Sequence, residues 1–166
     1  LRKVGYWGTN KMSVYNELKY NVSFANAGGL VLLSTQTASS SASISFTSGI
    51  NSTYKEYLFI FNNLHPASDA TNGKLTFNLS TDGGSTYNVT KTSTFFEASH
   101  DEGGSFTGLG YESGHDLAQS TGYQNLARSL SFDNDHNLAG FLHLFDPSNT
   151  TFVKHFIATI NTNFAG

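Results

Sequence analysis

The chain contains several short segments in which apolar and polar residues alternate, or in which a few apolar residues follow one another. These segments are 30–36, 41–47, 56–64, 74–80, 127–133, 138–146 and 151–160. Successive side chains of a β-strand point to opposite faces, so a period of two indicates strands with one buried face. No segment beyond residue 30 keeps the 3.6-residue period of a helix. The pattern therefore predicts an all-β domain.

Residues that favour turns separate the predicted strands. The clusters are 47–51, 66–73, 82–85 and 146–149. Short strands joined by such turns are typical of an antiparallel β-sandwich or jelly roll, and this is the fold that we predict.

The segment STDGGSTY at 80–87 is the strongest turn signal. Asp82-Gly83 or Gly83-Gly84 can adopt the positive φ values of a two-residue hairpin turn. We predict that this turn folds 74–80 back onto 86–92. Asp82 is therefore expected to be a turn residue rather than a carboxylate of a site.

Residues 1–29 are expected to form an extended N-terminal arm, and residues 30–166 the β-domain. The boundary is predicted at Gly28-Gly29, because two glycines after an irregular polar segment let the chain change direction. The arm has a net charge of +3 and the rest of the chain a net charge of −6. This distribution is expected if the arm docks on a neighbouring subunit, and equally if it is a solvated tail. Residues 20–24 alternate as in a strand and 14–18 would suit a helical turn, so the structure of the arm stays open.

Composition and charge narrow the classes of function. The chain has no cysteine, which excludes disulfides, thiolate metal sites and a cysteine nucleophile. Charged residues make up 13% and aromatic residues 14%, which indicates a neutral polar surface and enough aromatic side chains for a packed core. We expect no membrane insertion and no secretory signal at the start, because no apolar run is long enough for either. A net charge of −3 without a basic stripe disfavours nucleic-acid binding.

Motifs for catalysis and metal binding fail at the positions that matter. GYESG at 110–114 has Glu112 where a nucleophile elbow needs Ser. DNDHN at 133–137 begins like a calcium loop, but Leu138 stands at the Gly position and Leu144 at the final Glu position. The six histidines show no zinc-binding spacing. We therefore expect no catalytic residue, no metal and no cofactor, while an irregular oxygen-ligand site at 133–137 stays open.

One segment concentrates acidic residues between glycines. Residues 97–116 contain five acidic residues and no Lys or Arg. A long connection of this kind is uncommon without a role. It can be a solvated loop, a contact with another subunit, or a binding site for a cation or ligand. The candidate contact residues are His100, Asp101, Glu102, Tyr111, His115 and Asp116.

A longer pattern of strand and turn residues runs through the body of the chain. Its positions are Gly28, Gly29, Ile50, Ser52, Thr53, Tyr54, Lys55, Tyr57, Asn63, Leu64, Pro66, 80–87, Leu142, Leu144, Phe145, Asp146, Pro147, Ser148 and Thr151. The pattern resembles a β-rich domain of virion proteins of tailed bacteriophages, especially marine ones. It contains no catalytic signature. The resemblance implies a further closing pair of strands beyond the position of Gly166.

The resemblance implies a non-enzymatic structural component on the virion surface, such as a tail-fibre module that attaches to the host or to the particle. Its partners would be other virion subunits and a glycan or protein of the host surface. Open strand edges and many Phe side chains favour a homo-oligomer, and we expect a trimer. Tyr87, beside the predicted hairpin tip, would contact outside molecules. Trp7 would be either a stacking platform or an anchor for the arm.

Other functions stay open at this point. A capsid decoration or head-fibre protein fits the same resemblance. A carbohydrate-binding module outside any virus would use Trp7 and Tyr side chains as stacking platforms. An enzyme that cleaves polysaccharide would need two carboxylates at a suitable separation, which no pattern in the chain indicates.

Overall fold

The computed structural model describes residues 29–66, 73–130, 133 and 135–163, and every strand in this part of the chain pairs antiparallel. The strands are β1 (Glu56–Leu64), β2 (Leu75–Phe77), β3 (Phe96–His100), β4 (Thr107–Tyr111), β5 (Gln124–Ala127), β6 (Leu138–Phe145) and β7 (His155–Thr162). The described residues include no helix. The predicted all-β class is confirmed, and the sandwich or jelly-roll arrangement stays a prediction.

The chain divides into two compact units, Leu1–Thr35 and Gln36–Gly166. Of the first unit only residues 29–35 are described, and they form no strand or helix. The predicted arm therefore lies outside the described residues, except for Gly29. All seven strands belong to the second unit.

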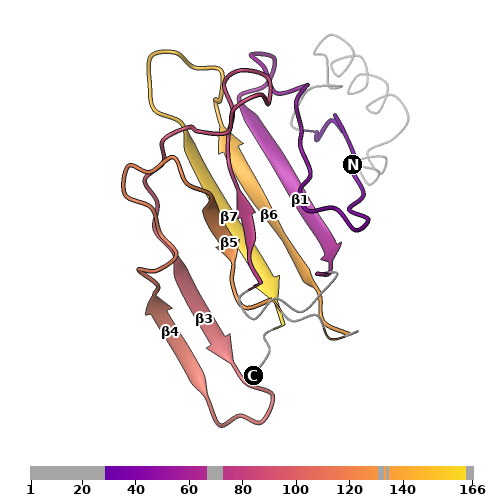
Figure 1. Cartoon of the computed structure of the whole chain (residues 1–166), viewed down its shortest axis with the longest axis vertical. Helices are drawn as coiled ribbons and strands as arrows, with labels where there is room; N and C mark the ends of the chain where they lie inside the picture. The colour runs from indigo at the N-terminus through magenta and orange to yellow at the C-terminus, as the bar shows by residue number, and fades with distance from the viewer. Residues whose placement is uncertain (1–28, 67–72, 131–132, 134, 164–166) are drawn as a thin grey trace, which may run out of the picture. The chain divides into compact units, whose positions relative to one another are not determined.

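The largest sheet has three strands in the order β1-β6-β7 (Figure 1). β6 pairs with β7 over eight consecutive residues without a shift of register. The pairing of β6 with β1 shifts between Phe61 and Leu64, where Asn63 has a φ of 52°. The buried side chains of these strands point to one face of the sheet, and the side chains on the other face are more exposed.

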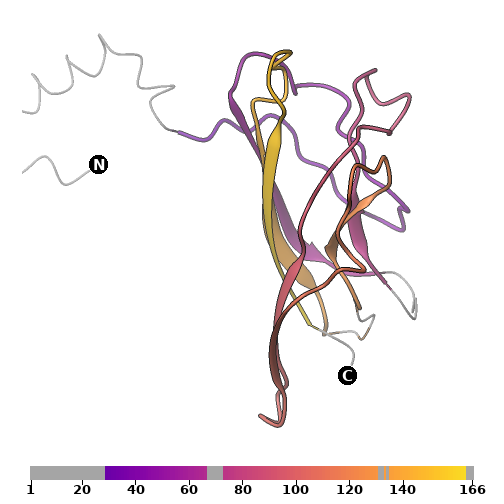
Figure 2. The ribbon, with the colours of Figure 1, turned by 90° about the vertical axis from the view of Figure 1, so that its left-hand side faces the viewer.

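The core lies on the buried face of this sheet. It contains Tyr57, Leu142 and Leu144 from the sheet, together with Leu126 from β5. The small sheet of β2 and β5 packs over this face (Figure 2), and the rings of Phe77 on β2 and Phe156 on β7 meet edge to face at 5.0 Å. Each large apolar side chain that is fully buried here contributes about 1.5–3 kcal/mol.

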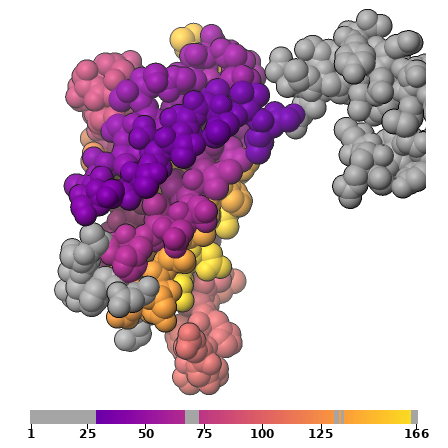
Figure 3. Space-filling view, turned by 90° about the vertical axis from the view of Figure 1, so that its right-hand side faces the viewer, coloured from indigo at the N-terminus to yellow at the C-terminus, as the bar shows by residue number. Residues whose placement is uncertain are grey.

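The segment before β1 completes this core without forming a strand. Residues 36–55, in purple, run over the surface beside β1 (Figure 3). The ring of Phe46 lies 5.6 Å from that of Phe59, and Tyr54 lies 6.1 Å from Tyr57. These side chains cover part of the sheet.

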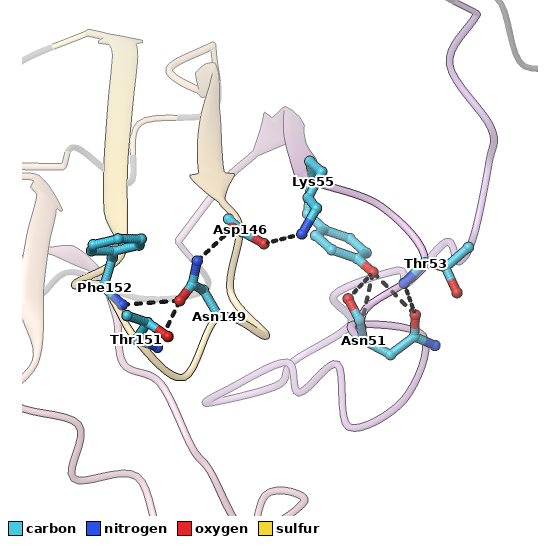
Figure 4. A network of polar contacts seen from close by, with 8 residues as sticks. Asn51, Thr53, Lys55, Asp146, Asn149, Thr151 and Phe152 are labelled. Carbon is cyan, nitrogen blue, oxygen red and sulfur yellow. Dashed lines mark hydrogen bonds and ion pairs between the residues drawn. The ribbon is translucent and has the colours of Figure 1, made fainter.

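Two hydrogen-bond networks tie this segment and the β6–β7 turn to the sheet (Figure 4). The hydroxyl of Tyr57 donates to the carbonyl oxygen of Asn51 and accepts from its backbone N–H, both at 2.8 Å. In the β6–β7 turn, the carboxylate of Asp146 accepts from Lys55 and from Asn149, both at 2.9 Å. Two parts of the sequence pattern that lie far apart in the chain therefore meet at one end of the sheet.

Several predicted strands are wrong. Segments 30–36 and 41–47 form no strand: Leu30 and Leu32 are exposed, and the alternation in 41–47 reflects one-sided packing such as that of Phe46. The strand predicted at 127–133 shares only Ala127 with β5 (Gln124–Ala127), which pairs with β2; residues 128–130 belong to no strand, and residues 131 and 132 lie outside the described residues. The long loop predicted between residues 97 and 116 contains the β3–β4 hairpin.

The turn at 80–87 has the predicted positive φ values, but it is not the predicted two-residue hairpin turn, because the backbone N–H of Val89 donates to the carbonyl oxygen of Leu79 across the whole of 80–88. Gly83 and Gly84 have φ values of 74° and 90°. Asp82 closes the turn by accepting hydrogen bonds from Ser80 Oγ at 2.5 Å and from the backbone N–H of Thr86 at 2.8 Å. The predicted strand 86–92 is not formed, because Lys91 exchanges two backbone hydrogen bonds with Ser120 instead.

Candidate functional site

The predicted contact residues fall into separate groups. His100, Asp101 and Glu102 lie at the turn of the β3–β4 hairpin, whereas Tyr111, His115 and Asp116 lie at the other end of β4. Tyr87 follows the turn at 80–85, outside both groups. Trp7 lies outside the described residues. The sequence therefore identified the segment but not its division by a hairpin.

The hairpin projects from the rest of the second unit as a two-stranded ribbon (Figures 1 and 2). Asp101 organises its turn: its carboxylate accepts from the N–H of Phe106 at 2.7 Å and from the hydroxyl of Ser105 at 2.5 Å. These hydrogen bonds, that of Ser105 first, lower the pKa of Asp101. The acid therefore acts as a turn residue, and its carboxylate already accepts three hydrogen bonds within the turn.

One face of the hairpin is apolar and exposed. Phe96 pairs with Tyr111 across the two strands, and Ala98 pairs with Leu109. The exposed fractions are 67% for Phe96, 82% for Leu109 and 48% for Tyr111. The rings of Phe96 and Tyr111 meet edge to face, with their centroids 5.3 Å apart. An isolated ribbon with a bare apolar face is marginally stable in water, so something must hold it.

A cluster of ion pairs at the base of the hairpin provides that attachment. Arg128, just after β5, donates two hydrogen bonds of 2.6 Å to the two carboxylate oxygens of Glu97 on β3. Its guanidinium also lies 3.7 Å from the carboxylate of Glu112. The hydrogen bonds to Glu97 raise the pKa of Arg128 above its usual value. Two parallel bonds of this kind fix position as well as charge.

His115 lies beside this cluster as a packed neutral residue. Its Nδ1 accepts from the side-chain amide of Asn125 at 2.9 Å, and its ring lies 5.5 Å from that of Phe95. Burial, together with the positive charges of Lys74 and Arg128, lowers the pKa of His115 below 6.5. A neutral imidazole whose Nδ1 is already bonded has a structural role at this position.

Tyr111 and Asp116 form a pair next to the exposed face. The phenol of Tyr111 donates to a carboxylate oxygen of Asp116, and this hydrogen bond raises the pKa of Tyr111 above 10.0. The phenol is therefore held protonated and fixed in direction. An exposed ring held in this way suits stacking and hydrogen bonding with a ligand surface.

Sequence reasoning missed Arg128 and Asn125. Both lie outside the acidic segment 97–116. Nothing in the sequence shows that β5 runs past the base of the hairpin. The only sequence signal was an imbalance: the five acids of that segment have no basic residue among them and need one from elsewhere.

Lys91 is the most buried charged side chain among the described residues, with 5% of its surface exposed. Its ammonium donates to Oδ1 of Asn78 at 2.5 Å and to the carbonyl oxygen of Val89 at 2.7 Å. Burial lowers the pKa of Lys91. These contacts hold the segment that follows the 80–85 turn, and we assign Lys91 this structural role.

The described part of the chain contains no group of three or more His, Asp or Glu side chains placed to hold a metal ion. Within the same residues, no helix is long and apolar enough to cross a membrane. Comparisons with known proteins find no matching family model, no matching curated protein and no matching solved structure.

Proposed function

We propose that the chain is a non-enzymatic structural component of a tailed-phage virion, a module of a tail fibre or another surface appendage, and that the β3–β4 hairpin is one of its contact surfaces. The observation that carries the contact surface is the exposed apolar face of the hairpin, with Phe96, Leu109 and Tyr111. The virion context is supported by the sequence resemblance, which includes the turn at 80–87 and the β6–β7 turn.

The size of the hairpin face indicates the kind of contact. Two paired strands of five residues present a face of about 17 Å by 10 Å, or roughly 170 Å². A stable protein interface needs about 800 Å² on each partner, so one hairpin face supports only weak binding. Weak contacts become effective when several copies act together, as they do in an oligomeric appendage. The hairpin therefore suits attachment through several identical copies.

A carbohydrate-binding module is the second candidate. Tyr111, with its ring exposed and its hydroxyl fixed by Asp116, offers a stacking surface beside hydrogen-bonding groups. Sugars are bound by such combinations of aromatic faces and polar side chains. A phage fibre can use the same chemistry, so the two proposals differ mainly in where the protein is found.

Location is the direct test. Antibodies against the chain, used for immunogold electron microscopy of purified particles of the phage that encodes it, are expected to label the tail fibres. Label on the head would replace the fibre by the capsid decoration or head-fibre alternative. Particles without label would overturn the virion proposal and leave the carbohydrate-binding module. Release of reducing ends from polysaccharide by the purified chain would overturn its non-enzymatic character.

The contact surface needs its own test. An excess of the purified chain is expected to inhibit adsorption of the phage to its host, and Leu109→Ser, which removes an 82% exposed side chain, is expected to weaken the inhibition. Ile60→Ser is the matched control, because Ile60 is 68% exposed on β1, away from the hairpin. Equal inhibition by both variants would exclude the hairpin as the contact.

A further inference from the structure

β7 is the outer strand of the three-stranded sheet and has one free edge (Figure 1). On one side it pairs with β6 through eight residues. On its other side, no backbone group of the described residues donates to or accepts from β7. In an antiparallel strand the backbone groups point alternately to the two sides, so about half of those in β7 have no partner along this edge.

The opposite edge of the sheet is protected in a way that β7 is not. β1 has a register shift near Leu64 and a positive φ at Asn63, which interrupt its edge. β7 has no register shift, and its sequence HFIATINT contains no Pro, Lys, Arg, Asp or Glu. Proteins use bulges, charges and prolines to prevent edge strands from pairing, so their absence here marks β7 as able to pair.

Exposed apolar side chains accompany the free edge. Phe152 and Val153, just before β7, are exposed at 71% and 79%, and Ile157 within it is exposed at 60%. An occupant of this edge must therefore supply backbone hydrogen bonds and apolar side chains together. A regular β-strand with apolar residues on one face supplies both.

We propose that β7 pairs antiparallel with β7 of a second copy of this chain about a two-fold axis. A suitable partner is a regular strand of similar length with a free edge. Among the described strands, β2, β3, β4 and β5 have three to five residues and β1 is interrupted, so β7 itself is the best match.

The pairing is self-complementary. When Ala158 lies on the two-fold axis, Ile157 lies opposite the partner subunit's Thr159 on the exposed face of the sheet. The result is a six-stranded sheet whose two outer strands are the interrupted β1 strands, so further growth is blocked. The contact gives a dimer in place of the trimer expected from the sequence. It rests on the strand edge alone, and its failure would leave the proposed function unchanged.

Reciprocal charge changes test this pairing in any register that keeps the same faces together. We expect the wild-type chain to reach twice its 18.0 kDa mass as protein concentration rises in light scattering. Ile157→Lys with Thr159→Lys places like charges opposite each other across the two copies, and so does Ile157→Glu with Thr159→Glu. Each double variant alone should therefore remain a monomer, with half the mass of the wild-type dimer. An equimolar mixture should restore a dimer that contains one copy of each, measured by native mass spectrometry.

Two further measurements keep the proposal falsifiable. Ile60→Lys with Ala139→Lys puts two lysines on the same exposed face, on β1 and β6 rather than on β7, and it should leave the dimer intact. Hydrogen exchange of the wild type should slow in β7 as concentration rises, which needs no variant. A wild-type monomer at all concentrations, a trimer, a mixture that stays monomeric, or loss of the dimer in the control variant would each overturn the two-fold pairing through β7.

Discussion

The ion pair between Arg128 and Glu97 is expected to hold the β3–β4 hairpin on the rest of the second unit. The two side chains are 25% and 24% exposed, and they share two hydrogen bonds of 2.6 Å. Exposed pairs contribute about 0.2–1 kcal/mol, and loss of one partner of a buried pair costs about 3–5 kcal/mol. For this intermediate burial and bidentate geometry we expect a coupling free energy of about 1–2 kcal/mol.

The neighbouring Glu112 makes the two single changes unequal. After Glu97→Gln, the guanidinium of Arg128 still has the carboxylate of Glu112, 3.7 Å away in the native structure. After Arg128→Gln, two carboxylates remain without a cation between them. We therefore expect Arg128→Gln to lower the free energy of unfolding more than Glu97→Gln does.

Urea unfolding of the wild type, both single variants and the double variant at pH 7 measures the coupling as a double-mutant cycle. Hydrogen exchange should accelerate in β3 and β4 in the Arg128→Gln variant more than in β6. High salt should reduce the coupling, because both side chains are partly exposed. A coupling below about 0.3 kcal/mol, or a larger loss for Glu97→Gln, would refute this account of how the hairpin is held.

Three other changes test the fold. Gly140→Ala should lower the free energy of unfolding by about 1–3 kcal/mol, because the new Cβ would lie 2.3 Å from a backbone oxygen of β7. Gly110→Ala is the control: its new Cβ would have its nearest atom at 3.9 Å, so the free energy of unfolding should change by less than about 0.5 kcal/mol. Equal urea midpoints for the two variants would contradict the crowding at Gly140. Tyr57→Phe should cost about 1–2 kcal/mol in urea unfolding, since its buried hydroxyl bonds twice to Asn51, and an unchanged midpoint would contradict that role. Hydrogen bonds, that of Ser80 first, lower the pKa of Asp82 to about 2. Its contribution to the free energy of unfolding is therefore present above pH 4 and is lost as the pH falls through 2, so the stability difference between the wild type and Asp82→Asn should shrink over that range. A constant difference would contradict the lowered pKa.

The sequence predicted β1 and β6 well because both are long segments rich in apolar residues that end next to polar turn residues. β7 was found with an early start, since Phe152 and Val153 are apolar but exposed and precede the strand. The strand predicted at the apolar run 30–33 is not formed, because apolar residues alone do not form a strand without another strand to pair with. Tertiary pairing, which a single sequence does not show, decides these cases.

The β3–β4 hairpin was missed because its glycines hide the period of two. Gly108 and Gly110 occupy one face of β4, where apolar or polar side chains would otherwise show the alternation. The sequence identifies the candidate residues as one segment. Only the pairing of β3 with β4 shows that they lie at opposite ends of a hairpin. The contact of Arg128 with Glu97 joins residues 31 positions apart and depends on where β5 ends, which periodicity does not fix.

The balance of buried and exposed apolar surface links the hairpin and the β7 edge. Among the described residues, six apolar side chains are buried, whereas sixteen large apolar side chains are substantially exposed. Each of these that became fully buried against a neighbour would contribute about 1.5–3 kcal/mol, which is large beside the usual 5–15 kcal/mol stability of a domain. The exposed side chains include Phe96 and Leu109 on the hairpin and Ile157 on β7, so the same shortage of internal burial explains both surfaces. Burial of these surfaces against neighbouring subunits would add to the stability that the core provides, which is the arrangement that we propose for both the hairpin and the β7 edge.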